Sequence, residues 1–317
     1  MKTLDSLCPD VDDEVIQDFV SRMDPEYFER FQPDTIAHHI QLASRLTPDH
    51  PCELSVLDKG AGRSEISIVA YDYFSEFAAI CGVLSAFGLN IEEGRIYTFV
   101  EATPSTAGRP KGRPGLSRKK IVDVFLVHPI DRTGFPLPQH NTLRQTVSEI
   151  VQLLDTRQFE EARQYVNRRL VERLDKQRSA FTGLLDTVQI TFDNSQSATD
   201  TIMDIQSDDT PAFLYALANA LAMRNIYITK AQIECDGAKL HDRFFVRNRD
   251  GQKLIDSADQ QQLRLTAVLI KQFTHALTWA SDPAKALASF DQFLDLIVKD
   301  QGKKSKNQAL DFVSDKK

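Results

Sequence analysis

The chain has 317 residues, enough for two or three domains, and four scattered cysteines that form no C-x-x-C pair. Lysine and arginine number 38 against 45 aspartates and glutamates, and the net charge of −7 excludes a global positive field that would attract nucleic acid or an anionic membrane. The first residues lack the apolar core of a signal peptide, and no stretch reaches the length of a membrane span. We therefore expect a cytoplasmic protein with reduced thiols and no membrane partner.

Residues 1–50 are predicted to form a helical N-terminal segment. Asp24-Pro25-Glu26 restarts a turn, and Pro33 opens a further helix. His38 and His39 are adjacent, and neighbours on a helix point about 100° apart, so we do not expect them to share a metal ion. One apolar helical face consists of Val15, Phe19 and Met23.

Residues 51–158 are predicted to form a first α/β module. Two strands flank Gly60-Ala61-Gly62, which lacks the lysine and following helix of a phosphate-binding loop and is interpreted as a hairpin turn. A helix and two further strands follow. The hairpin between those strands contains a basic, Pro/Gly-rich insert at residues 101–120. We expect a surface loop there, with contact to an acidic partner as the alternative, and no nucleic-acid partner because aromatic rings for base stacking are missing.

A long helical stretch is predicted over residues 141–179. Its first part would cover the first sheet, and residues 159–185 would form a charged helical connector between two modules. The covering face of the first part consists of Leu143, Val147, Ile150 and Leu154.

Residues 186–280 form the second predicted module. An apolar strand stops at Asp208-Asp209-Thr210-Pro211, where Thr210 can cap a helix and Pro211 suits its first turn. Asp236-Gly237 is predicted as a hairpin turn between two strands. Residues 281–317 are expected to form a C-terminal helix and a polar linker.

The two modules are copies of one pattern. Asp72 matches Asp209, 137 positions further on, and the same offset carries the apolar helix positions of the first module onto those of the second. The matched helix positions are Phe77, Ile80 and Leu84 in the first copy and Leu214, Leu217 and Leu221 in the second. We call residues 51–158 the first copy and residues 186–280 the second copy.

Both copies resemble ACT domains, the small βαββαβ modules that bind amino acids. The closest likeness is to the tandem pair in the C-terminal part of bacterial PII uridylyltransferases, with D-x-P-G-L-L opening a helix, A-x-I-x-T ending a strand, and D-x-F-x-V. Here the second copy reads DTPAFL at 209–214, AQIEC at 231–235 and DRFFV at 242–246. Ala212 replaces the motif glycine, and the first copy lacks both proline and glycine at 72–77.

The resemblance covers roughly residues 50 to 280 and implies an α+β fold. Two ferredoxin-like βαββαβ ACT modules with antiparallel sheets are expected, together with the helical N-terminal segment and helical connectors. The modules would pair with each other within the chain or across a homodimer. The family carries its ACT pair after the catalytic parts, whereas Met1 stands just before it here. The expectation is therefore a free-standing module or a natural chain that continues past Lys317.

Motifs for catalysis are missing from the sequence. A nucleotidyltransferase of the resembled family needs G-S followed by D-x-D, because paired carboxylates hold the metal ions that bridge nucleotide phosphates, and this pattern does not occur. His241-Asp242 imitates the pair of metal phosphohydrolases but lies on a predicted strand without further His/Asp clusters, so we interpret it as structural. No cofactor is expected. Whether the chain is the regulatory fragment of a nucleotidyltransferase stays open.

An amino-acid site is predicted where a strand turns into a helix. That turn presents free amide groups at a positive helix end, which suits a ligand carboxylate. The resemblance places the ligand between this turn and the sheet of the neighbouring module. Glu76 would repel a carboxylate, which favours the second copy over the first. The nominated ligand-binding residues are Asp209, Thr210, Pro211, Ala212 and Phe213 in the second copy, and Asp72, Ser75 and Asn90 in the first.

The functional hypothesis is an allosteric amino-acid sensor of nitrogen metabolism with glutamine as the expected ligand. It would control a linked or partner enzyme, such as a PII uridylyltransferase or a glutamine synthetase adenylyltransferase. One alternative is a structural ACT pairing module without ligand, in which Asp209 and Thr210 only cap a helix. Another is the N-terminal regulatory part of a nucleotidyltransferase or of an amino-acid dehydrogenase.

Overall fold

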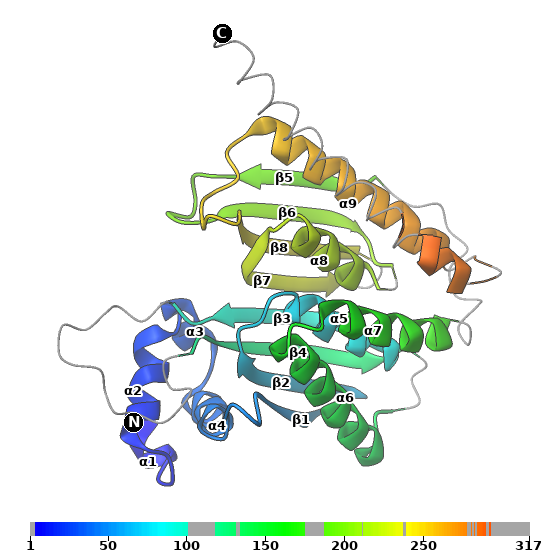
Figure 1. Cartoon of the computed structure of the whole chain (residues 1–317). Coiled ribbons are helices and arrows are strands. Elements are labelled where there is room, and N and C mark those ends of the chain that lie inside the picture. The colour runs from blue at the N-terminus through cyan, green and yellow to red at the C-terminus, as the bar shows by residue number, and fades with distance from the viewer. Residues whose placement is uncertain are drawn as a thin grey trace.

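The computed structural model describes residues 4–100, 118–130, 134–174, 187–210, 212–236 and 239–277, together with residues 280, 282, 284–289 and 292. Within these residues, eight strands form one antiparallel sheet in the order β1-β2-β4-β3-β7-β8-β6-β5 (Figure 1). The first copy contributes β1 (Cys52–Gly60), β2 (Arg63–Tyr71), β3 (Leu89–Thr98) and β4 (Lys120–Pro129). The second contributes β5 (Gln189–Asp193), β6 (Thr201–Asp208), β7 (Tyr227–Asp236) and β8 (Lys239–Arg247).

Each copy has the same element order, ββαββα. The helices of the first copy are α5 (Glu76–Ala86) and α6 (Leu137–Asp155), and those of the second are α8 (Phe213–Met223) and α9 (Ser257–Leu277). The predicted α+β fold with two ferredoxin-like modules is confirmed. One detail differs from the expected βαββαβ order, because the edge strand comes first in each copy. Since β1 lies beside β2 and β5 beside β6, the four-stranded arrangement is the same.

The two copies join through their inner strands. β3 and β7 pair antiparallel, with Gly94 opposite Ile233 and Tyr97 opposite Lys230. α5 and α8 contact each other above this junction. Gly82 of α5 is close-packed there, since an added Cβ would collide with Val166 and Tyr215. The copies therefore pair within the chain, which is one of the two expected arrangements.

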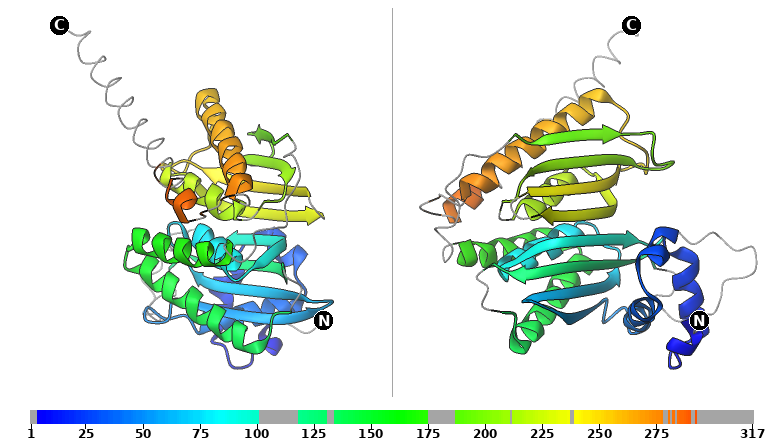
Figure 2. Two further views of the ribbon diagram at one scale, coloured as in Figure 1. Left: turned by 90° about the vertical axis from the view of Figure 1, so that its right-hand side faces the viewer. Right: turned by 180° about the vertical axis from the view of Figure 1, so that it is seen from behind.

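The predicted long helix after β4 is broken. α6 ends at Asp155 and α7 (Phe159–Leu174) begins four residues later, with Arg157 between them in the left-handed conformation at φ 60°. The predicted helical stretch thus consists of two helices, and the second begins at residue 159, the predicted start of the connector. The left-handed Arg157 between them was not predicted, because a non-glycine residue in that conformation gives no sequence signal. α5, α6, α7, α8 and α9 all lie on one side of the sheet (Figure 2).

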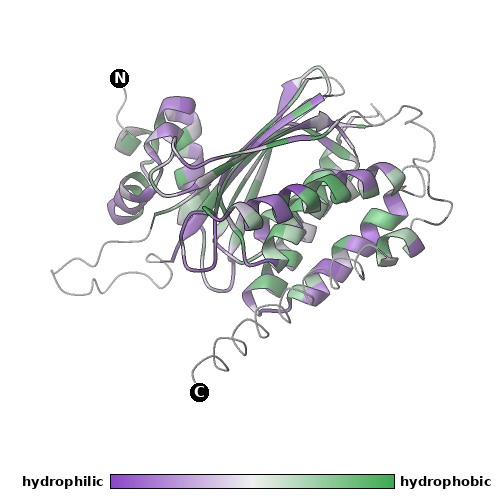
Figure 3. Ribbon diagram, turned by 90° about the horizontal axis from the view of Figure 1, so that it is seen from above, coloured by the Kyte–Doolittle hydropathy of each residue, from purple (hydrophilic) through white to green (hydrophobic). Residues whose placement is uncertain are grey.

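The N-terminal helices cover the opposite side of the first copy (Figures 2 and 3). His39 is fully buried there and bonds through Nδ1 to the Tyr27 hydroxyl at 2.6 Å and through Nε2 to the Ser67 hydroxyl at 3.0 Å. Burial lowers the pKa of His39 to about 3, so the ring is neutral. These helices are α1 (Leu4–Leu7), α2 (Asp13–Arg22), α3 (Pro25–Arg30) and α4 (Pro33–Ser44).

Helix α3 also reaches the second copy. The Glu26 carboxylate pairs with Lys230 and accepts a hydrogen bond from the Gln232 side chain at 3.0 Å, both on β7. Lys230 lies 3.5 Å from Asp24 as well. The N-terminal segment thus contacts both copies and holds their junction from the face opposite α5 and α8.

Some predicted features lie outside the described residues. These are most of the basic insert (101–117), part of the connector (175–186), Pro211, the turn at 237–238 and most of the C-terminal segment, in which 284–289 are helical. Among the described residues, none of the helices is long and apolar enough to cross a membrane. The same residues contain no group of three or more His, Cys, Asp or Glu that could hold a metal ion.

Candidate functional site

Two cavities lie at the boundary between the copies and are related by the repeat. The second-copy cavity, about 50 Å³, is lined by the turn before α8 and by the start of β3 from the first copy. The first-copy cavity, about 230 Å³, is lined by the turn before α5 and by the start of β7 from the second copy. Because β3 and β7 are antiparallel neighbours, each turn meets the strand start of the other copy.

The turn itself is conserved in geometry between the copies. Ser75 and Ala212 occupy the position of the motif glycine and both adopt the left-handed conformation, at φ 65° and 58°. Neither helix has a side-chain cap on its first amide groups. Two non-glycine residues therefore keep a backbone shape that costs about 1 kcal/mol each. The loss of glycine has not erased the turn.

Thr210 does not cap α8 as predicted. The helix begins at Phe213, after the left-handed Ala212, and the buried Thr210 hydroxyl instead bonds the hydroxyl of Thr274 on α9 at 2.8 Å. The turn is thus fixed against the covering helix, and the alternative that Thr210 is merely a helix cap was wrong.

Asn90 belongs with the turn of the second copy. We grouped it with the first copy by sequence, but both Asn90 and Asp209 line the second-copy cavity, where Asn90 influences the ionisation of Asp209. Burial raises the pKa of Asp209, while Lys271, the Thr210 amide and the Asn90 side chain oppose that rise. The equivalent of Asn90 in the second copy is Tyr227, which lines the other cavity.

A buried lysine and a buried aspartate lie behind the second-copy turn. Lys271 of α9 is fully buried, with its ammonium nitrogen 3.7 Å from the ring centroid of Phe213 and without a hydrogen-bond partner among the described residues. Burial lowers its pKa to about 8, and burial raises the pKa of Asp242, which lines the cavity, to about 8. The two opposite charges partly compensate one another.

Arg173 of the connector helix α7 completes the lining. Its guanidinium covers Gly88, because a Cβ added to that glycine would collide with it. Sequence reasoning missed both Arg173 and Lys271, since they come from covering helices and not from the motif. A lysine within the apolar stripe of a predicted helix was the available signal for Lys271.

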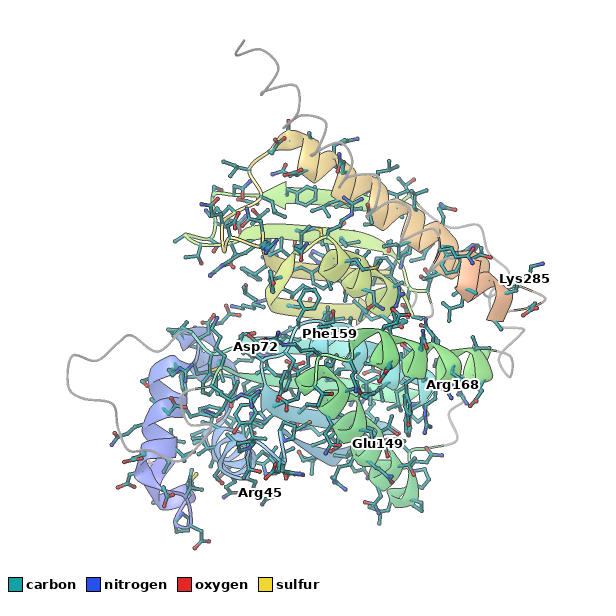
Figure 4. The ribbon with its side chains drawn as sticks, in the orientation of Figure 1. Arg45, Asp72, Glu149, Phe159, Arg168 and Lys285 are labelled. Carbon is teal, nitrogen blue, oxygen red and sulfur yellow. The ribbon has the colours of Figure 1, made fainter. Side chains whose placement is uncertain are left out.

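The structure places the nominated residues in two groups. Asp209, Thr210, Ala212, Phe213 and Asn90 line the second-copy cavity, which also has Arg173 and Asp242 in its wall. Asp72 and Ser75 line the first-copy cavity instead. Asp72 is exposed. Asp72 and Phe159 both lie near the boundary between the two copies (Figure 4).

The second-copy cavity therefore combines both signs of charge with hydrogen-bonding groups. The positive N-terminal end of α8, which no side chain caps, and the Arg173 guanidinium suit an anion. Asp209 and Asp242 suit a cation, and Asn90 can both donate and accept. Such a wall complements a zwitterion, a molecule that carries one carboxylate and one ammonium group.

Comparisons with known proteins agree with this fold. Residues 189–279 match a family model described as an ACR9-like, ACT-like domain. No solved structure gives a match. The chain is 24% identical over 262 residues to a bifunctional uridylyltransferase/uridylyl-removing enzyme of Azospirillum brasilense, an alignment that covers 82% of this chain and 24% of that protein.

Two further relatives have the same description. The protein of Caulobacter vibrioides is 26% identical over 272 residues, covering 86% of this chain and 26% of its own length. That of Ruegeria pomeroyi is 28% identical over 219 residues, covering 69% and 20%. The chain spans about a quarter of the length of these curated relatives. The second copy is thus an ACT-like domain, and the chain is related over most of its length to part of bifunctional uridylyltransferase/uridylyl-removing enzymes.

Proposed function

We propose that the chain is a cytoplasmic regulatory module that binds a small amino acid, glutamine, in the second-copy cavity. Binding would control a linked or partner enzyme of nitrogen metabolism, such as a PII uridylyltransferase or a glutamine synthetase adenylyltransferase. The observation that carries the proposal is the contact of the Asp209 turn with Asn90 of the other copy, in a cavity with both signs of charge. The relatives named above are bifunctional uridylyltransferase/uridylyl-removing enzymes, which supports the choice of a uridylyltransferase as the linked or partner enzyme.

Each group of a bound amino acid has a partner in this cavity. The ligand carboxylate would accept hydrogen bonds from backbone amides at the start of α8, where the helix end is positive. It would also accept hydrogen bonds from the Arg173 guanidinium. The ligand ammonium group would donate a hydrogen bond to the Asp209 carboxylate. A side-chain amide fits Asn90, which offers both a donor and an acceptor and so distinguishes glutamine from glutamate.

Binding at a boundary gives a physical route to regulation. A ligand that contacts both copies favours the arrangement it binds best, and a coupling of about 1 to 3 kcal/mol gives a response of about 5- to 150-fold. The cavity of about 50 Å³ is smaller than the roughly 300 Å³ of ordinary small-molecule pockets, so the turn or the Arg173 side chain must move to admit glutamine. Ligand occupancy would thereby change the junction between β3 and β7.

The second candidate function is a pairing module without ligand. The small volume of the second-copy cavity favours it, as does Lys271, which already supplies an internal cation near Asp209. In that case the two copies form a rigid surface for a partner domain, and the catalytic part of a nucleotidyltransferase or of an amino-acid dehydrogenase would be that partner.

Calorimetric titration of the purified chain separates the two candidates. L-glutamine should bind saturably, L-glutamate more weakly because Asn90 and Asp209 disfavour a second carboxylate, and D-glutamine more weakly because its groups cannot all meet their partners. Absence of binding heat and of thermal stabilisation with every proteinogenic amino acid would favour the pairing module.

A further inference from the structure

The first-copy cavity differs from its repeat partner in charge. Glu76 stands where the second copy has Phe213, since both follow the left-handed residue of the turn. Val151 stands where the second copy has Lys271, 120 positions on. The same offset of 120 relates Arg144 of α6 to Arg264 of α9. Arg144 donates to the Leu54 carbonyl on β1, and Arg264 donates to the Ile190 carbonyl on β5. At the matched positions, the second copy thus has a buried cation that the first copy lacks, and the first copy has a buried carboxyl group that the second copy lacks.

The Glu76 side chain lies in its own turn, where a ligand carboxylate would otherwise bind. Its side chain is 4% exposed, and Oε2 accepts a hydrogen bond from the Tyr73 amide at 3.2 Å. The carboxylate of the protein therefore occupies the Tyr73 amide of its own turn. A ligand carboxylate would meet repulsion here, so the preference of this cavity for charge is inverted.

Two buried carboxyl groups point into the first-copy cavity without a full set of partners. Oε1 of Glu76 and Oδ1 of Asp123, which is 1% exposed, have no hydrogen-bond partner among the described residues. Burial raises the pKa of both groups well above the usual range, and repulsion from Asp72 adds to it. Buried acceptors of this kind are costly unless something donates to them.

Positive side chains do not compensate these carboxyl groups. The described residues that line the cavity include no lysine or arginine. Arg118, on the nearby chain before β4, donates instead to the Tyr73 hydroxyl at 2.9 Å and to Asp155 at 3.1 Å. The cavity therefore combines buried carboxyl groups with about 230 Å³ of space and has no lysine or arginine in its described lining.

Aromatic rings form the other part of the wall. Phe74 and Tyr227 lie with ring centroids 5.7 Å apart at an interplanar angle of 62°, one from each copy. Tyr73 and Phe77 add further aromatic surface. Ring faces attract cations, and the attraction increases when the cation is removed from water.

We propose that the first-copy cavity binds an organic cation, an ammonium or guanidinium group such as the one at the end of the side chain of a basic amino acid. The cation donates hydrogen bonds to Glu76 and Asp123 and lies against the rings of Phe74 and Tyr227. Any proton that the two carboxyl groups hold leaves to solvent as the cation enters. The chain would then carry two boundary sites of opposite preference, one zwitterionic and one cationic.

The test compares ligands that differ by one charge. L-arginine and L-citrulline have nearly the same shape, as do L-lysine and L-norleucine, and each pair is titrated by calorimetry to about 10 mM. At least one cationic member should bind about tenfold or more tightly than its neutral analogue. Equal affinity within both pairs, or no binding by either cation, would overturn the proposal and leave a structural carboxyl pair.

Variants in the two cavities show which cavity binds the cation. Glu76→Gln keeps the shape and removes the charge, and Val151→Lys supplies the internal cation of the second copy, so each should abolish cation binding. Asn90→Ala, in the other cavity, should leave it unchanged. Cation binding that persists in a folded Glu76→Gln protein would contradict the site. Glutamine binding is measured on the same proteins, and its presence or absence reports on the second-copy cavity alone.

Discussion

Asn90 lies against the Asp209 turn and opposes the rise of the Asp209 pKa on burial, although the two residues belong to different copies of the repeat. Asn90 lies near the start of β3 in the first copy, and Asp209 precedes the first turn of α8 in the second. The contact exists because β3 and β7 pair antiparallel and bring each strand start to the turn of the other copy. A ligand between these two side chains would be in contact with both copies at once.

The Arg173 guanidinium should carry part of the affinity for an amino-acid carboxylate. Arg173→Met keeps much of the aliphatic stem and removes the charge, so glutamine binding should weaken about tenfold through loss of a charge-assisted hydrogen bond. Arg168→Met is the matched control, because Arg168 is exposed on the same helix and does not line the cavity (Figure 4). Equal weakening by both variants would point to general charge and not to the cavity.

Glycine at the left-handed turn positions should stabilise the fold. Ala212→Gly removes the crowding of Cβ at φ 58°, which is worth about 1 kcal/mol, against a smaller entropic cost in the unfolded chain. The free energy of unfolding from urea titration should therefore rise by up to about 1 kcal/mol. Ser75→Gly, in the equivalent turn at φ 65°, should behave the same way. A loss of stability in both variants would show that the turns have another conformation in solution.

The buried His39 should make the chain sensitive to acid. Its pKa is about 3 in the folded protein and near 6.5 when unfolded, so the unfolded state binds a proton that the folded state rejects. This contribution to stability is complete above pH 6.5 and is lost as pH falls toward 3, at up to about 1.4 kcal/mol for each pH unit. His39→Gln should lower stability at pH 7 but flatten its decline between pH 6 and 4. An unchanged slope would mean that His39 is not the group responsible.

Gly82 should tolerate no side chain. Alanine normally favours a helix interior by about 1 kcal/mol over glycine, but a Cβ at this position collides with Val166 and Tyr215. Gly82→Ala should instead destabilise the chain by about 1 to 3 kcal/mol, because α5, α7 and α8 must separate to admit the methyl group. Thermal unfolding measures the sign, and stabilisation would contradict the close contact of α5 and α8.

The repeat and its turns could be read from the sequence because their signals are local. The offset between Asp72 and Asp209, with its apolar helix stripe, predicted both modules and the place where each turn meets a strand. Local signals did not predict the start of α8, since a left-handed alanine moved it past Thr210. The connector helix begins at residue 159 as predicted, but the left-handed Arg157 before it was not predicted.

Side chains that enter a site from distant elements were not predictable in this way. Lys271 and Arg173 reach the second-copy cavity from helices whose facing surfaces are set only by tertiary packing. Glu76 was recognised as hostile to a carboxylate, but its approach to Asp123 joins residues that lie far apart in the chain. The charge of the first-copy cavity therefore became visible only in the fold.

The most direct test of a ligand held between the copies is a calorimetric titration of glutamine into the parent chain and into the Asn90→Ala variant. Loss of one side-chain partner should weaken binding by about tenfold, while thermal unfolding without ligand should change little because Asn90 is only half-buried. Tyr227→Ala, at the equivalent position of the other cavity, serves as the matched control. Our account predicts saturable binding by the parent chain that weakens in Asn90→Ala alone. Equal affinity in all three proteins, or no binding in the parent chain, would contradict it.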